Sequence, residues 1–155
     1  MVLVVDDAED IRGLFGVWLK KDYEVKFAAT GAEALALADT EPLPDLNLLD
    51  IELPDMDGYE VCKRLKASPP LAAILVIFVT ERNDPRDQAR GLMSGAVDYI
   101  TKPLSAPVML LRVRTQLALE SQIQKRTEEL QETRARHKDE LEGIHDPDFG
   151  APPKK

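Results

Sequence analysis

The stretch "LNLLDIELPDMDGYE", residues 46–60, begins as an apolar run and becomes polar at Asp50. A short run that is apolar at nearly every position is typical of a strand buried on both faces, and the Pro and Gly that follow it indicate a turn. Asn47 is the exception inside the run, because a buried amide without hydrogen-bond partners destabilises a core. Residues 46–60 therefore predict a buried strand that carries the Asp50 carboxylate to the edge of a sheet.

Strand and helix patterns alternate five times on either side of this stretch. The predicted strands are "VLVV" (2–5), "YEVKFA" (23–28), "LNLLD" (46–50), "AILVIFVT" (73–80) and "DYI" (98–100). The predicted helices cover residues 9–20, 30–39, 57–68 and 84–94, and a long helix begins at about Ser105. Apolar strands that alternate with helices predict a doubly wound α/β fold, with a parallel five-stranded sheet between two helical layers.

Composition limits the size and class of the protein. A chain of 155 residues is long enough for one domain and about 50 further residues. Residues 1–104 hold 19 acidic and 11 basic side chains, a net charge of -8, which argues against direct binding of nucleic acid. The chain shows no secretion signal and no apolar run of membrane length. The single Cys62, which we interpret as a core residue, fits a reducing compartment, so we expect a cytoplasmic protein.

Polar residues follow four of the predicted strands. They are Asp6, Asp7, Asp50, Thr80 and Lys102. Because parallel strands end at the same edge of a sheet, and ligands of such sheets bind at that edge, these side chains should converge. For any single Asp here, a role as a helix cap or turn residue is the simpler interpretation. The joint pattern of carboxylates, a hydroxyl and an ammonium favours a functional site.

Four blocks carry a family resemblance: "VVDD", "LLDIELPDMDG", "FVT" and "DYITKP". In these blocks the chain resembles the receiver (CheY-like) domain of bacterial two-component response regulators, over roughly residues 1–120. The resemblance implies a flavodoxin-like (βα)5 sandwich with strand order 2-1-3-4-5. It also implies a phosphoacceptor switch in two-component signal transduction or a phosphorelay, phosphorylated by a sensor histidine kinase or a phosphotransfer protein.

Clustered carboxylates repel one another unless a cation neutralises them. Oxygen ligands suit Mg²⁺ or Mn²⁺, with Asp7 and Asp50 as direct ligands and Asp6 binding directly or through water. The resemblance adds the backbone carbonyl of Glu52 as a ligand. With the metal in place, Asp50 can act as the nucleophile and become an aspartyl phosphate.

The remaining site residues are expected to bind the phosphoryl group or to respond to it. Lys102 supplies an ammonium to pair with the phosphoryl oxygens, and Thr80 supplies a hydroxyl. The resemblance makes Thr80 the switch hydroxyl and Tyr99 the aromatic that turns inward with it, and it implies a cis peptide before Pro103. Catalysis would then be limited to the phosphorylation and dephosphorylation of the chain's own aspartate.

Two positions depart from the family pattern. Glu81 stands where the family usually has a small residue, and a bulky acid there would slow the access of a donor or hydrolysis. Arg82 follows it, and we expect Arg82 and Glu52 to face each other. These three residues are predicted to influence the lifetime of the phosphoryl group.

The C-terminal part of the chain has two interpretations. Residues 121–145 are predicted to extend the last helix, with Ile123, Leu130, His137 and Ile144 at intervals of seven. This spacing is consistent with a parallel coiled-coil dimer or with a solvated single helix. His137 and His145 lack neighbours with metal-ligand spacing. Residues 146–155 are predicted to be a disordered tail.

The output of the switch is not encoded in a recognisable motif. No output domain follows the predicted receiver, so a fragment of a longer regulator and a stand-alone receiver both remain open. Asp98 and Arg112 match a salt-bridging pair at a dimer face of DNA-binding relatives, which favours a homodimer. Two other classes of protein fit the sequence less well. An interaction module that works without phosphorylation would lack the acids or Lys102, and an aspartate-dependent hydrolase would carry its nucleophile after the first strand.

Overall fold

A computed structural model describes residues 1–144 of the chain. Its elements are β1 (Val2–Val5), α1 (Glu9–Leu19), β2 (Val25–Ala28), α2 (Gly31–Ala38), β3 (Leu46–Leu49), α3 (Gly58–Lys66), the short helix η1 (Leu71–Ala73), β4 (Leu75–Thr80), α4 (Pro85–Met93), β5 (Asp98–Thr101) and α5 (Ala106–Ile144). The five strands form one parallel sheet in the order β2-β1-β3-β4-β5. The predicted α/β fold and strand order are confirmed.

Two element boundaries differ from the prediction for local reasons. Tyr23 was expected in the second strand, but its N–H donates to the carbonyl of Leu19 at 3.0 Å and so closes the last turn of α1. Ala73, expected to begin the fourth strand, belongs instead to η1. In each case the first residues of the apolar run form a helical hydrogen bond with the preceding turn, so the strand begins later than the apolar run does.

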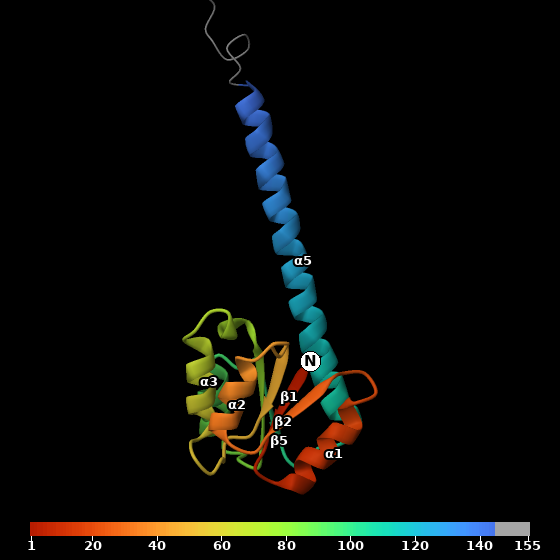
Figure 1. The fold of residues 1–155 in the computed structure, drawn as a ribbon, viewed down its shortest axis with the longest axis vertical. Helices are drawn as coiled ribbons and strands as arrows, with labels where there is room; N and C mark the ends of the chain where they lie inside the picture. The colour runs from red at the N-terminus through yellow and green to blue at the C-terminus, as the bar shows by residue number, and fades with distance from the viewer. Residues whose placement is uncertain (145–155) are drawn as a thin grey trace, which may run out of the picture. The chain divides into compact units, whose positions relative to one another are not determined.

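The sheet separates two apolar cores. On one face, β-strand side chains such as Phe78 pack with Ala34 of α2 and Val61 of α3. On the other face they pack with Phe15 of α1 and with Met109 near the start of α5. Figure 1 shows α2 and α3 on one side of the sheet and α1 on the other. Both faces of the central strands are therefore covered, which is why their sequences are apolar throughout.

The strand register determines which polar residues meet at the carboxyl edge. Val5 pairs with Leu49 across β1 and β3, so Asp6 and Asp50 leave the sheet side by side. At the same edge, on the other side of β3, the N–H of Lys102 after β5 donates to the carbonyl of Thr80 at the end of β4, at 2.8 Å. The sheet thus brings the ends of β1, β3, β4 and β5 to one place.

Asn47 lies in the middle of β3 and is fully buried. Neither its side-chain oxygen nor its side-chain nitrogen has a hydrogen-bond partner among residues 1–144. Its neighbours on the adjacent strands are Leu3 and Val76, both apolar. The sequence indicated that this amide needed a partner, and the fold provides none from these strands.

The chain divides into two compact units, Met1–Leu117 and Ala118–Lys155, of which the second is described only as far as residue 144. In that second unit, residues 118–144 continue the helix, and Ile123, Leu130 and Leu141 are exposed. His145 and the predicted tail 146–155 lie outside the described residues. Across residues 1–144, no helix combines the length and the apolar character that a bilayer crossing would need.

Candidate functional site

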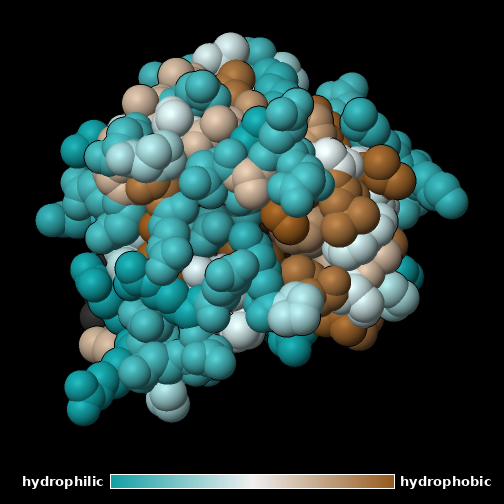
Figure 2. Space-filling view, turned by 90° about the horizontal axis from the view of Figure 1, so that it is seen from below, coloured by the Kyte–Doolittle hydropathy of each residue, from teal (hydrophilic) through white to brown (hydrophobic). Residues whose placement is uncertain are grey.

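A cavity of about 170 Å³ opens at the carboxyl edge of the sheet. It is lined by Asp6, Asp7, Ala8, Ile11, Asp50, Glu52, Glu81 and Lys102. Figure 2 views the molecule from below Figure 1, and it shows mostly hydrophilic side chains on this face, with hydrophobic atoms gathered at one side. Six of the residues predicted for the site from the sequence therefore line one cavity.

The three aspartates of the cavity form a compact group of oxygen ligands. One carboxylate oxygen from each of Asp6, Asp7 and Asp50 lies within 4.8 Å of the others. Asp6 is 2% exposed and Asp50 is 7% exposed, whereas Asp7 is open to solvent. Asp6 and Asp50 therefore form the buried part of the group, and Asp7 forms its solvent-exposed part.

Lys102 neutralises the two buried members. Its Nζ donates to Asp6 Oδ2 at 2.5 Å and to Asp50 Oδ2 at 3.0 Å. Burial by itself would lower the pKa of Lys102, but its hydrogen bonds to these carboxylates outweigh burial and raise it. Burial also raises the pKa of Asp6. Lys102 thus stays protonated, and its charge is shared between the ends of β1 and β3. The peptide bond before Pro103 is cis.

The loop after β3 holds the second oxygen of Asp50. The N–H of Glu52 donates to Asp50 Oδ1 at 3.2 Å, and the N–H of Gly58 donates to the carbonyl of Ile51 at 2.7 Å. A Cβ atom at Gly58 would collide with the backbone carbonyl of Asp50, so this close approach requires glycine. Asp57 caps α3 by accepting from the N–H of Glu60. The acids of the opening stretch thus separate into the Asp50 carboxylate and residues that shape its loop.

Asp55 has a contact that the sequence did not reveal. Its two carboxylate oxygens accept from the N–H groups of Gly31 and Ala32 at 2.8 and 2.9 Å, in the first turn of α2. These two bonds lower the pKa of Asp55. The side chain of Met56 also lies against Gly31, where an added Cβ would meet it. No local motif joins residues 24 positions apart, and so the sequence suggested only a turn residue.

Thr80 and Tyr99 do not line the cavity. Thr80 is buried, and its hydroxyl accepts from the N–H of Arg82 at 3.4 Å. Tyr99 is half-buried against Phe78, and its hydroxyl donates to the carbonyl of Arg82 at 2.9 Å. Burial is the main cause that raises the pKa of Tyr99. Both residues therefore contact the backbone of Arg82 rather than the aspartates.

The side chain of Arg82 connects the loop after β3 to α4. Its Nε donates to Glu52 Oε1 at 3.1 Å, so the two side chains face each other, and a second guanidinium nitrogen lies 3.6 Å from Asp87 Oδ1. The hydroxyl of Tyr59 in α3 donates to the same Asp87 oxygen at 3.2 Å. The guanidinium of Arg90 lies 4.1 Å from the centre of the Tyr59 ring. Tyr59, Asp87 and Arg90 were not singled out from the sequence, because only the folded chain brings them together.

The donor set of the cavity suits a hard divalent cation. Three carboxylate oxygens lie close together, and one of the three residues is open to solvent, which leaves room for water ligands. The described residues supply no His or Cys to this group, so a metal that prefers nitrogen or sulfur is not favoured. The residues present therefore fit Mg²⁺ or Mn²⁺.

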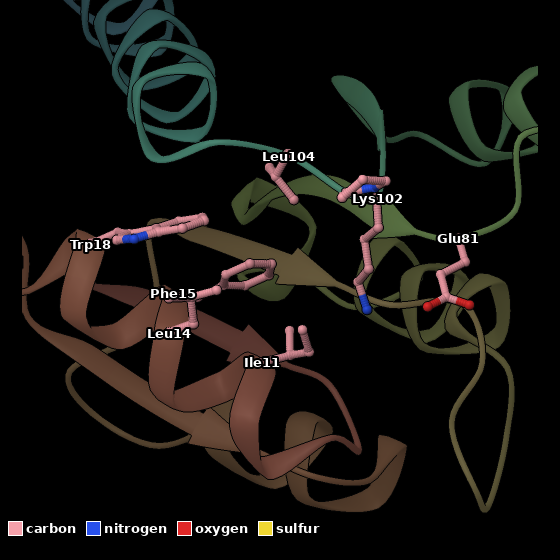
Figure 3. A pocket seen from close by; sticks show the side chains of 8 residues that line it. Ile11, Leu14, Phe15, Trp18, Glu81, Lys102 and Leu104 are labelled. Carbon is pink, nitrogen blue, oxygen red and sulfur yellow. The ribbon is translucent and has the colours of Figure 1, made fainter.

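An apolar pocket of about 380 Å³ adjoins the aspartates. Figure 3 shows the residues that line it: Ile11, Leu14, Phe15 and Trp18 from α1, Leu104 and Pro103 from the loop after β5, with Lys102 and Glu81 beside them. Ile11, Glu81 and Lys102 line both this pocket and the polar cavity. The reactive edge of the sheet thus has an apolar surface directly next to it.

Comparison with known proteins agrees with this geometry. Residues 2–114 match the model of the response regulator receiver domain. The chain is 41% identical over 116 residues to a probable cyclic di-GMP phosphodiesterase of Vibrio cholerae, covering 75% of this chain and 26% of that protein. It is 42% identical over 115 residues to the response regulator PleD of Caulobacter vibrioides, covering 74% and 25%. The chain thus spans about a quarter of the length of these two relatives.

A solved structure shows the same fold. It is the crystal structure of a response regulator receiver domain protein (CheY-like) from Methanospirillum hungatei JF-1, with a TM-score of 0.72 and 32% identity. The match covers 78% of this chain and 95% of that one.

Proposed function

The chain belongs to the response regulator receiver domain family, and on that premise we propose that it is a phosphoacceptor switch in which Asp50 becomes an aspartyl phosphate. The observation that supports this most directly is the position of Asp50 in the cavity, with one oxygen on the Glu52 N–H and the other on Lys102. Both contacts orient the carboxylate from the buried end of β3. An oriented carboxylate beside a cationic side chain is the arrangement that a phosphoryl transfer requires.

Asp6, Asp7, Asp50 and the Glu52 carbonyl would hold Mg²⁺ or Mn²⁺, which when bound neutralises negative charge on the donor and acceptor oxygens. An oxygen of Asp50 attacks phosphorus, a P–O bond forms, and the bond from phosphorus to the donor's leaving atom breaks. Lys102 pairs with the transferred group, exchanging its contact with the Asp50 carboxylate for one with the phosphoryl oxygens. The chain then acts only on its own aspartate and is not an enzyme for a separate substrate.

The switch is proposed to act through Thr80 and Tyr99. The Thr80 hydroxyl would leave the Arg82 N–H to reach a phosphoryl oxygen, and Tyr99 would follow into the space it vacates. Because both residues contact the backbone of Arg82, their movement would also displace the loop before α4. Glu52, Glu81 and Arg82 would then influence the lifetime of the phosphoryl group, as residues that line or border its cavity.

The proposed donors are a sensor histidine kinase or a phosphotransfer protein in the cytoplasm. A protein donor has to bring its phosphorylated side chain to Asp50, and therefore it covers the surface around the cavity. The adjoining pocket supplies apolar contact area there, with Leu14 44% exposed (Figure 3). A small phosphodonor would not use this pocket.

The output is proposed to follow from a change of assembly or of an attached domain. The similarity to PleD and to a probable cyclic di-GMP phosphodiesterase is limited to a quarter of each, so an output domain of that kind is a proposal for the whole protein.

We divide the chain into a receiver at 1–120 and a helical extension at 121–145, of which residue 145 is not described. Exposed Ile123 and Leu130 support a coiled-coil dimer of this extension, without direct contact with nucleic acid. The ion pair between Arg112 and Asp98, at 3.1 Å, supports a second dimer face near β5.

Intact mass after incubation with acetyl phosphate and Mg²⁺ tests the proposal. The expected result is one added phosphoryl group in the wild type and in the control Asp22→Asn. This control removes an exposed acid from the loop between α1 and β2, at the edge of the sheet opposite the cavity. Asp50→Asn should remain unlabelled. Labelling of Asp50→Asn at the wild-type level would exclude Asp50 as the acceptor, and labelling without a divalent cation would exclude the metal's role. Sizing of both states would report on dimerisation.

A further inference from the structure

We propose that Asp55 is a positioning residue for the metal site, because it anchors the loop between β3 and α3 to the first turn of α2. This inference rests on the proposed magnesium site. The carboxylate of Asp55 accepts hydrogen bonds from Gly31 and Ala32, neither of which lines the cavity. It acts through the backbone of the loop, three positions from Glu52.

The loop needs an external anchor on the side where Asp55 lies. At its base, Gly58 bonds to Ile51 and Glu52 forms a bridge with Asp57. Leu53, Pro54, Asp55 and Met56 form the tip beyond these contacts. Leu53 and Met56 pack against the core, and Met56 lies against Gly31 of α2. The carboxylate of Asp55 adds directional hydrogen bonds from the tip to α2, at 2.8 and 2.9 Å.

The helix terminus offers Asp55 a strong attachment. The first backbone N–H groups of a helix have no partner within the helix, and a carboxylate satisfies both their hydrogen bonds and their partial positive charge. In α2, Thr30 accepts from the N–H of Glu33, and Asp55 takes the N–H groups of Gly31 and Ala32. The loop therefore completes the cap of α2 and is fixed by it.

Fixing the loop fixes the two backbone groups that act in the cavity. The N–H of Glu52 holds one oxygen of Asp50, and the carbonyl of Glu52 is a proposed ligand of the metal. Without the Asp55 bonds, the loop keeps its bridge between Glu52 and Asp57 and its apolar packing, but the two backbone groups of Glu52 are held less firmly. A cation then has to order the loop further as it binds. Partners that orient metal ligands typically change metal affinity on the order of tenfold or more.

The test is a calorimetric titration of the folded protein with MgCl₂. Asp55→Ala should raise the Kd for Mg²⁺ on the order of tenfold, and Asp55→Asn should raise it less, because one amide oxygen can still accept a bond. Two controls separate anchoring from other effects. Thr30→Ala weakens the cap of α2 without touching the loop, and Glu33→Gln removes a negative charge at the same helix end, where it accepts from Ala29.

Both controls should stay within about twofold of the wild type. Hydrogen exchange of the Glu52 amide, measured without metal, provides a second readout, and Asp55→Ala should accelerate it while Thr30→Ala should not. An unchanged Kd in Asp55→Ala, or an equal rise in Glu33→Gln, would overturn the anchoring role. Absence of Mg²⁺ binding by the wild type would instead overturn the proposed metal site itself.

Discussion

Replacing Asn47 by Leu should stabilise the receiver domain. Asn47 is 0% exposed, and both polar atoms of its side chain lack a protein partner among residues 1–144. A buried polar group without a hydrogen bond costs about 1–3 kcal/mol. Leu has the same branching at Cγ, so it removes this cost while keeping the shape of the side chain.

Extra volume opposes this gain. Leu is larger than Asn, and overpacking of a closed core costs about 1–3 kcal/mol, while the added apolar burial returns part of that cost. The removed polar cost and the overpacking cost are of similar size, and the added apolar burial then leaves an expected rise of about 1 kcal/mol in the free energy of unfolding of Asn47→Leu. For a unit of this size the melting temperature should rise by about 4 °C for each kcal/mol.

Urea and thermal unfolding of the full chain, followed by circular dichroism, measure the change in stability of the unit Met1–Leu117, which contains Asn47. Asn47→Val serves as a second variant, because it removes the amide while adding less volume than Leu. Asn47→Asp serves as the opposite control: a buried carboxylate has a raised pKa, so its penalty should grow as pH rises above about 4. If both Asn47→Leu and Asn47→Val lower the stability, the amide has a favourable interaction in the folded protein and the reasoning is refuted.

Three further predictions concern the edge of the sheet. Lys102→Ala leaves two buried carboxylates without their partner and should cost about 3 kcal/mol in urea unfolding, of which added MgCl₂ should recover a part; equal stability with and without Lys102 would contradict this. Hydrogen bonds lower the pKa of Asp55, so its contribution to stability is present above pH ~4 and is lost as the pH falls through the lowered pKa. The melting temperatures of the wild type and Asp55→Asn should therefore converge in acid, and a constant gap would contradict the assignment. Glu52→Ala and Arg82→Ala should alter the rate of autodephosphorylation, measured as loss of the added mass, and unchanged rates in both would end the idea that their contact affects the lifetime.

Much of this architecture was predictable because it depends on patterns that are local in the sequence. The apolar runs of β1, β3 and β4 identify central strands of a covered parallel sheet, and that sheet's geometry brings Asp6, Asp50 and Lys102 together. The order of the strands was predicted from the family resemblance, because apolar runs alone do not indicate which strands are neighbours in the sheet. β2 at the edge of the sheet has a weaker pattern, and its start was placed two residues early.

The parts that were not predicted depend on contacts between distant residues. The bonds from Asp55 to α2 and from Tyr59 to Asp87 join elements that are 23 to 28 positions apart in the chain. Asp, Tyr and Arg are common at exposed turns and helix faces, so their types alone do not indicate a partner. The predicted contact of Glu52 with Arg82 was accessible only because the family resemblance places both beside the same cavity.

The contacts of Lys102 have a consequence for how folding and metal binding relate. A site made of carboxylates alone would repel itself in the apo protein, and its folding would depend on a bound ion. Here the chain carries its own counter-ion, which bridges the ends of two strands from a third. Folding of the domain therefore does not require a bound ion, and a cation entering the proposed site would compete with an ammonium group that is already in place. If the chain is the proposed phosphoacceptor, such competition would favour weak, exchangeable binding, and the local concentration of the divalent cation would set the fraction of molecules ready to react.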